Sequence, residues 1–99
     1  MEPPLAPSCD LDPDGLRLQR ERYRRAGDGA TLRERTDRLI ALDVSPGGAA
    51  VVPDLIEVES ACCPFFDLSW DPGSRRFSIA VGDREHEPAL EAIAFALGL

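Results

Sequence analysis

The sequence predicts one small α+β domain, in which a four-stranded antiparallel sheet is covered by helices. Two pairs of short alternating segments are each joined by a turn signal, which is typical of β-hairpins. Segments with helical periodicity precede, separate and follow these pairs. The chain has 99 residues, of which 43% are hydrophobic and 29% charged, as expected for a single globular domain.

The N-terminal region predicts a tail followed by a helix. Residues 1–8 contain three prolines and no apolar period, so we expect a disordered tail before a single domain over residues 9–99. Asp12 and Pro13 are typical of an N-cap and a first helical position. The helix is predicted to continue to Ala26 and to end at the glycines of residues 27–29. One face of it carries Leu16, Gln19, Tyr23 and Ala26.

Residues 30–43 are predicted to form the first hairpin. Residues 31–35 and 38–42 flank a turn candidate at Thr36 and Asp37. One long helix is the alternative, because the segment is rich in Arg and Glu. Residues 45–48, Ser-Pro-Gly-Gly, then break the chain.

A second helix is predicted from about residue 52 to the adjacent cysteines. Pro53 is tolerated in a first helical turn, whereas Pro64 disfavours helical geometry at the residue before it. The helix should therefore end at the cysteine pair. Steps of three and four residues place on one face Val52, Leu55, Ile56, Glu59, Cys62 and Cys63.

The C-terminal third predicts a second hairpin and a last helix. Residues 65–71 and 76–81 alternate in polarity around a Pro-Gly turn, and Glu87-Pro88 begins a helix with an apolar stripe. The order helix, hairpin, helix, hairpin, helix implies a four-stranded antiparallel sheet. Rotating the termini of a ferredoxin-like fold would produce the last four of these elements. In the hairpin, we expect Phe66, Leu68 and Trp70 on one face opposite Phe77, Ile79 and Val81.

Charge excludes some classes of partner. The formal net charge is −7, and residues 39–99 hold three Arg against ten acids. Such a chain lacks the dominant basic surface that nucleic-acid binding requires, so the Arg run of residues 17–25 is interpreted as a solvated face.

No segment resembles a signal peptide or a membrane span, which predicts a cytoplasmic protein. All basic residues are Arg, which is typical of a GC-rich, bacterial coding sequence.

The cysteines are the first candidates for chemistry. Without a secretory signal, a structural disulfide framework is not expected, and two interpretations of Cys62 and Cys63 remain: buried apolar residues or a functional pair. Reactive redox thiols are usually activated at a helix N-terminus, but this pair lies at a predicted C-terminus, where the dipole opposes thiolate formation. A bound cation reverses that balance. The position therefore favours capture of a soft metal over redox catalysis.

Two other side chains could complete such a site. Glu59 lies on an otherwise apolar helix face and needs a partner there, unless it sits at the edge of the face and meets Arg or water. His86, the single histidine, lies in a polar loop, where it is either simply solvated or a ligand or general base. We expect both either to hydrogen-bond to the residues that bind the metal or to be alternative ligands of the metal.

Residues 10–21 match the calcium-loop pattern D-x-D-x-D-G-x5-E. An EF-hand needs a helix entering the loop, and the proline-rich residues 1–9 do not supply one. The acids also suit an ordinary helix start. We therefore predict that this segment does not bind calcium.

Residues 59–68, Glu-Ser-Ala-Cys-Cys-Pro-Phe-Phe-Asp-Leu, resemble a family of small bacterial domains with a Glu-x-x-Cys-Cys-x-Phe-Phe core. These domains occur alone or fused to MerR-type metal-responsive regulators. Residues 9–11 resemble the family's N-terminal Cys-x-Leu, and Arg20 and Tyr23 resemble its first helix, so that the likeness spans residues 9–98. The resemblance implies binding of a thiophilic metal or metalloid, with Cys9, Cys62 and Cys63 as ligands.

Three functions are therefore compared. The first is a thiol-based domain that sequesters, delivers or senses a soft metal such as mercury, arsenic, copper or zinc. The second is a small enzyme with Cys62 or Cys63 as nucleophile and Glu59 or His86 as base. The third is a non-catalytic module that binds a protein partner or a second copy of the chain.

Overall fold

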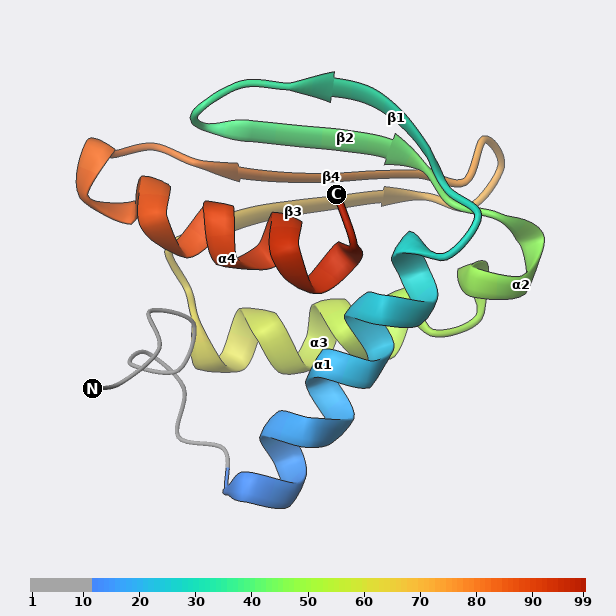
Figure 1. Ribbon diagram of the computed structural model, residues 1–99, viewed down its shortest axis with the longest axis horizontal. Helices are drawn as coiled ribbons and strands as arrows, with labels where there is room; N and C mark the ends of the chain where they lie inside the picture. The colour runs from blue at the N-terminus through green and yellow to red at the C-terminus, as the bar shows by residue number, and fades with distance from the viewer. Residues whose placement is uncertain (1–11) are drawn as a thin grey trace.

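The computed structural model describes residues 12–99, and the predicted tail and Cys9 lie outside the described residues. The described chain forms an α+β fold with one antiparallel sheet, as expected (Figure 1). Among the described residues no helix is long and apolar enough to cross a membrane. The elements are α1 (Pro13–Gly27), β1 (Thr31–Arg35), β2 (Leu39–Asp43), α2 (Pro46–Ala49), α3 (Val52–Cys62), β3 (Phe66–Asp71), β4 (Arg76–Val81), the 3₁₀ turn η1 (Arg84–His86) and α4 (Glu87–Leu97).

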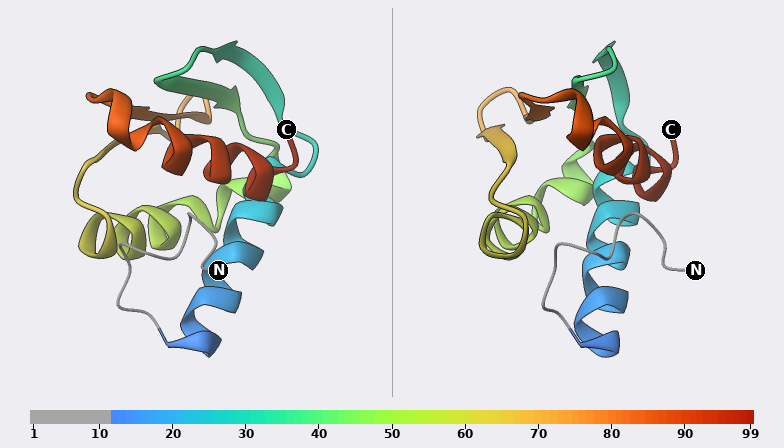
Figure 2. Two further views of the ribbon diagram at one scale, coloured as in Figure 1. Left: turned by 60° about the vertical axis from the view of Figure 1, so that its left-hand side comes forward. Right: turned by 90° about the vertical axis from the view of Figure 1, so that its left-hand side faces the viewer.

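The strands lie in the order β1-β2-β4-β3, and each neighbouring pair is antiparallel. The strands β2 and β3, joined through α3, are therefore parallel and separated by β4, which is the split β-α-β arrangement of ferredoxin-like topologies. The long helices α1, α3 and α4 all lie on one side of the sheet (Figures 1 and 2). No helix of residues 12–99 covers the other side of the sheet.

Residues 30–43 form the predicted hairpin and not a helix. The backbone N–H of Thr36 donates to Leu39 O over 2.8 Å and closes the turn, and the register shifts between Leu32 and Glu34. All five residues of β1 are exposed, because this strand lies at the sheet edge. Exposed Arg and Glu are thus compatible with a strand here, since edge strands are commonly protected by charges.

The second hairpin has the predicted register. Phe66 pairs with Val81, Leu68 with Ile79 and Trp70 with Phe77. The inward faces of β2, β3 and β4 meet the buried faces of the helices in one core. Its most deeply buried large side chains include Tyr23, Phe77, Ile40, Leu42, Leu55, Ile79, Leu90 and Ile93.

Two short elements were not expected from the sequence. The Ser-Pro-Gly-Gly break forms the one-turn helix α2, which Ser45 caps by accepting a hydrogen bond from Gly48 N over 3.2 Å. Gly48 is required here, because a Cβ atom would lie 2.6 Å from Arg25 O. The turn η1 precedes α4, and β3 begins at Phe66, one residue later than expected.

The acids of the calcium-loop pattern belong to the start of α1. Asp12 is the N-cap, and its Oδ1 accepts from Gly15 N over 2.7 Å. Asp14 pairs with Arg17, and Glu21 pairs with Arg24, within the helix. Asp10 lies outside the described residues. These acids therefore occupy a helix and its cap, while the absence of calcium binding remains a prediction.

Candidate functional site

Three of the predicted site residues, Glu59, Cys62 and Cys63, lie on or directly after the helix α3. It ends at Cys62, and Cys63 follows as its C-cap with φ −130° and ψ 76°. The backbone N–H of Cys63 still donates to Glu59 O over 2.7 Å, which continues the helical hydrogen bonding for one residue. Pro64 then redirects the chain into β3, as its effect on the preceding residue predicts. Glu59 and Cys63 are thus one turn apart and both about 2% exposed.

Glu59 is deeply buried and does not sit at the edge of the helix face, where Arg or water would meet it. Its Oε1 accepts hydrogen bonds from two side chains of α1: Tyr23 Oη at 2.8 Å and Gln19 Nε2 at 3.1 Å. Its Oε2 is equally inaccessible, yet no described residue donates to it. Buried polar atoms are nearly always hydrogen-bonded, so this oxygen stands out as an unused acceptor.

Gln19 connects the buried carboxylate to the protein surface. Its Nε2 donates to Glu59 Oε1 and also, over 3.0 Å, to Leu55 O on α3. Its Oε1 accepts from Arg22 Nη1 over 2.9 Å. Every polar group of the amide is therefore used, and this pattern fixes its orientation. Within residues 12–99, this polar network holds α1 against α3 and leaves Glu59 Oε2 without a donor.

The two cysteines differ in exposure. Cys63 is part of the hydrophobic core, whereas Cys62 is half-buried against it. Neither forms a disulfide with another described residue. Their thiols lie at the C-terminal end of α3, where the sequence places them. The third predicted ligand, Cys9, lies outside the described residues.

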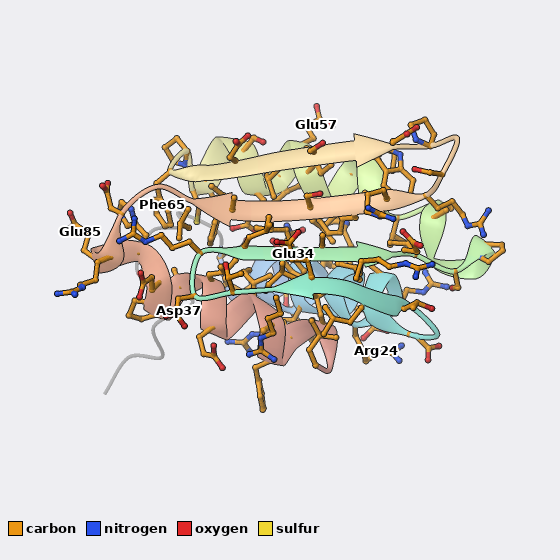
Figure 3. All side chains as sticks on the ribbon, turned by 90° about the horizontal axis from the view of Figure 1, so that it is seen from above. Arg24, Glu34, Asp37, Glu57, Phe65 and Glu85 are labelled. Carbon is orange, nitrogen blue, oxygen red and sulfur yellow. The ribbon has the colours of Figure 1, made fainter. Side chains whose placement is uncertain are left out.

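His86 lies at the end of η1 and stacks on Phe65. The two ring centroids are 4.1 Å apart and the rings are within 8° of parallel. Figure 3 shows Phe65 at the same end of the sheet as Glu85, the residue preceding His86. The Nδ1 atom of His86 is 3.8 Å from Asp83 Oδ2. An aromatic contact therefore brings this loop to the segment that follows the cysteine pair.

Residues 12–99 do not by themselves supply a closed metal site. They contain no group of three or more His, Cys, Asp or Glu side chains placed to hold a metal ion. What they do supply is two adjacent thiols, which are soft ligands, and a buried carboxylate with one unpaired oxygen. This donor set suits a thiophilic cation, and a three-thiolate site requires Cys9 in addition.

The sequence did not identify the partners of Glu59. Tyr23 and Gln19 were assigned to the buried face of the first helix, but not to a hydrogen-bonding role. The signal that could have identified this contact is the presence of polar groups on two core-facing helix stripes: the amide of Gln19 and the phenol of Tyr23 on one, and the carboxylate of Glu59 on the other. Buried polar groups need hydrogen-bond partners, so these side chains were candidates to bond to one another. Phe65 was likewise not anticipated as the contact of His86.

Comparison of the chain with protein-family models, with curated proteins and with solved structures finds no match.

Proposed function

We propose that this chain is a thiol-based domain that binds a soft metal or metalloid ion and thereby sequesters, delivers or senses it. The ligands are Cys62, Cys63 and Cys9, and the ion is mercury, trivalent arsenic, copper(I) or zinc. Thiolate is the ligand that these ions prefer among protein side chains.

The observation that carries this proposal is the unused oxygen of Glu59. It is buried, no described residue donates to it, and it belongs to the same helix face as the cysteine pair. A cation near the thiols would stabilise thiolates against the helix dipole and give the carboxylate an opposite charge. Such outer partners commonly orient and tune metal ligands. One bound ion would thus stabilise both the thiolates at the helix end and the buried carboxylate oxygen that has no described donor.

Each residue then has a distinct role. The thiolates hold the ion, while Tyr23 and Gln19 hold Oε1 of Glu59 and so orient its other oxygen. Glu59 either orients the ligands through its free oxygen or binds the ion itself as an additional ligand. His86 is the alternative fourth ligand for zinc, which prefers four-coordinate sites.

The same oxygen also supports a second candidate, a cysteine-dependent enzyme. A buried carboxylate with a free acceptor position can take the proton of a nearby nucleophile. Cys62, the more exposed thiol, is then the nucleophile, and Glu59 is the base. The two candidates differ in what happens to the thiols when no metal is present.

Metal binding is tested on the reduced full-length protein by equilibrium dialysis against each of the four ions with glutathione as competitor. We expect one ion per chain, held more tightly than by glutathione. Cys9→Ser, Cys62→Ser and Cys63→Ser should each weaken binding by at least about tenfold. Glu59→Gln should weaken it by about 10- to 100-fold, which is typical when a residue that orients a metal ligand is lost. Arg25→Gln, an exposed change on α1, is the matched control. Binding no tighter than that of the triple cysteine variant would overturn the proposal.

Alkylation of the metal-free protein with iodoacetamide separates the alternatives. One thiol that reacts much faster than free cysteine, and that Glu59→Gln slows, would favour the enzyme. If the thiols react only after unfolding and metal ions do not protect them, the result would favour the third function, a non-catalytic module that binds a protein partner. Protection of all three thiols by one equivalent of metal would support the metal-binding domain.

A further inference from the structure

A groove lies between α1 and α4, away from the cysteine pair. Its volume is about 960 Å³, near the upper end of the range for ligand sites. One wall consists of α1 side chains and the other of α4 side chains. Figure 3 shows Arg24, a residue of the α1 wall, projecting beyond the β1 edge of the sheet, on the side opposite Glu57 of α3. The principal lining residues are Arg17, Arg20, Arg24, Ala92, Phe95 and Ala96.

The walls of the groove are held in place by a close backbone contact. Gly27 at the end of α1 lies so near the end of α4 that a Cβ atom would be 1.9 Å from Leu97 O. Helices in such contact do not slide past one another without breaking their packing. The groove is therefore preformed, which lowers the entropy that a ligand must lose on binding.

Phe95 is the most unusual residue of the α4 wall. It is 84% exposed, whereas its neighbours Ile93, Ala94 and Leu97 are buried in the core. A single exposed aromatic side chain is common, but this one lines a groove together with the small residues Ala92 and Ala96. Aromatic and Arg side chains dominate binding energy at protein interfaces.

Among the charged residues of the groove, one cation is left without an ion pair to a described residue. The lining acid Glu21 pairs with Arg24, and Glu91 pairs with Arg35 of β1. Arg17 pairs with Asp14. Arg20 is exposed and makes no hydrogen bond or ion pair with another described residue. An acidic group that enters the groove therefore meets an unpaired guanidinium beside an apolar wall.

We infer that this groove binds an amphipathic helix of a partner protein, with a carboxylate on Arg20 and an apolar side chain on Phe95. On both walls the lining residues recur every three or four positions over two helical turns, a length of about 10 Å. The side chains on one face of a third helix recur at the same spacing, so they could contact both walls. The net charge of −7 argues against an extended polyanion as the occupant of the groove, because nucleic acids and anionic membranes repel a negatively charged chain. A short acidic motif interacts mainly with the nearby Arg side chains, since more distant charges are screened.

The test is a selection of 16-residue helical peptides, displayed on phage, against the full-length protein. We expect enriched peptides with an acid and an apolar residue three or four positions apart. The affinity of the best synthetic peptide is then measured by fluorescence anisotropy. Phe95→Ser and Arg20→Glu should each weaken it by about tenfold or more. The matched controls are Leu18→Ser and Arg25→Glu, which are exposed on α1 outside the groove and should change it less than twofold.

Several results would overturn this inference. They are a selection without enrichment, peptides that lack acids, and peptides whose binding is insensitive to both groove variants. Dimerisation in sedimentation experiments that Phe95→Ser abolishes would assign the groove to a second copy of this chain. Binding to vesicles of phosphatidylcholine and phosphatidylglycerol that depends on Phe95 would assign it to a membrane surface. Because the groove variants leave Glu59 and the cysteines unchanged, metal binding by these variants remains a separate measurement.

Discussion

Tyr23 Oη donates a hydrogen bond of 2.8 Å to Glu59 Oε1, and this contact joins α1 to α3 through two residues that are 36 positions apart in the chain. Tyr23 is 1% exposed and Glu59 is 2% exposed, so the contact lies in the interior. A buried acceptor that loses a donor carries the full cost of its desolvation. The contact therefore matters for stability as well as for the orientation of the second carboxylate oxygen.

Tyr23→Phe should lower the free energy of unfolding by about 1–3 kcal/mol, because Glu59 then keeps only Gln19 as a described donor. Urea unfolding of Tyr23→Phe, Glu59→Gln and the double variant measures the coupling between the two residues. We expect a coupling energy of at least about 0.5 kcal/mol, as is typical of residues in contact. Additive effects of the two substitutions would contradict the contact.

Gly27→Ala should destabilise the protein by about 1–3 kcal/mol or more, the range for overpacked sites. The new Cβ would lie 1.9 Å from Leu97 O, and a backbone atom cannot yield as a flexible side chain can. Gly47→Ala is the matched control, since nothing lies within 4 Å of its Cβ position. Thermal unfolding compares the two variants, and an equal effect of both would refute the close approach of α1 and α4.

Arg75 has a positive φ of 58° in the turn between β3 and β4, although the turn contains a glycine at position 73. Its Nε also donates to Val44 O over 2.9 Å. Arg75→Ala and Arg75→Gly both remove this hydrogen bond, but only glycine removes the backbone strain of a positive φ, because it has no Cβ atom. The Gly variant should therefore be more stable than the Ala variant by about 1 kcal/mol. Chemical denaturation measures the difference, and an Ala variant of equal or greater stability would exclude strain at this position.

Asp43 should make stability depend on pH. Its carboxylate pairs with Arg76 across the sheet and with Arg33 of β1. The hydrogen bond from Arg76, and then that from Arg33, lowers the pKa of Asp43 below its usual value. The stabilisation is therefore fully present above the pKa of about 3.9 in the unfolded chain, and is lost as pH falls through the lower folded-state pKa.

Asp43→Asn tests this dependence. At pH 7 the variant should be less stable than the wild-type protein, and the difference should shrink as pH falls below about 4. High salt should reduce it as well, because the pairs are on the surface. Asp37→Asn, an exposed turn residue without an ion pair to a described residue, is the control. A difference in unfolding free energy that does not change with pH would rule out this role of Asp43.

The sequence by itself determined the local elements of this protein. Asp12 caps α1, Pro64 follows the end of α3, and the alternation on both sides of the Pro-Gly turn sets the register of β3 and β4. Each of these features depends on residues close together in the chain, where backbone geometry and hydrophobic period act directly. The short helix α2 was missed because Ser-Pro-Gly-Gly was interpreted only as a break, although Ser45 and Pro46 form a local N-cap and first helical position.

Only the tertiary structure decided what Glu59 meets and which surfaces remain open. The carboxylate needed a partner on chemical grounds, but its donors come from a helix 36 and 40 residues earlier, and the sequence offered Arg and water equally well. The exposure of Phe95, and the lack of an ion pair from Arg20 to any residue of 12–99, could likewise be read only from the packed helices. Such contacts form between faces that local patterns mark as apolar or polar, while the choice of partner depends on how whole helices pack together.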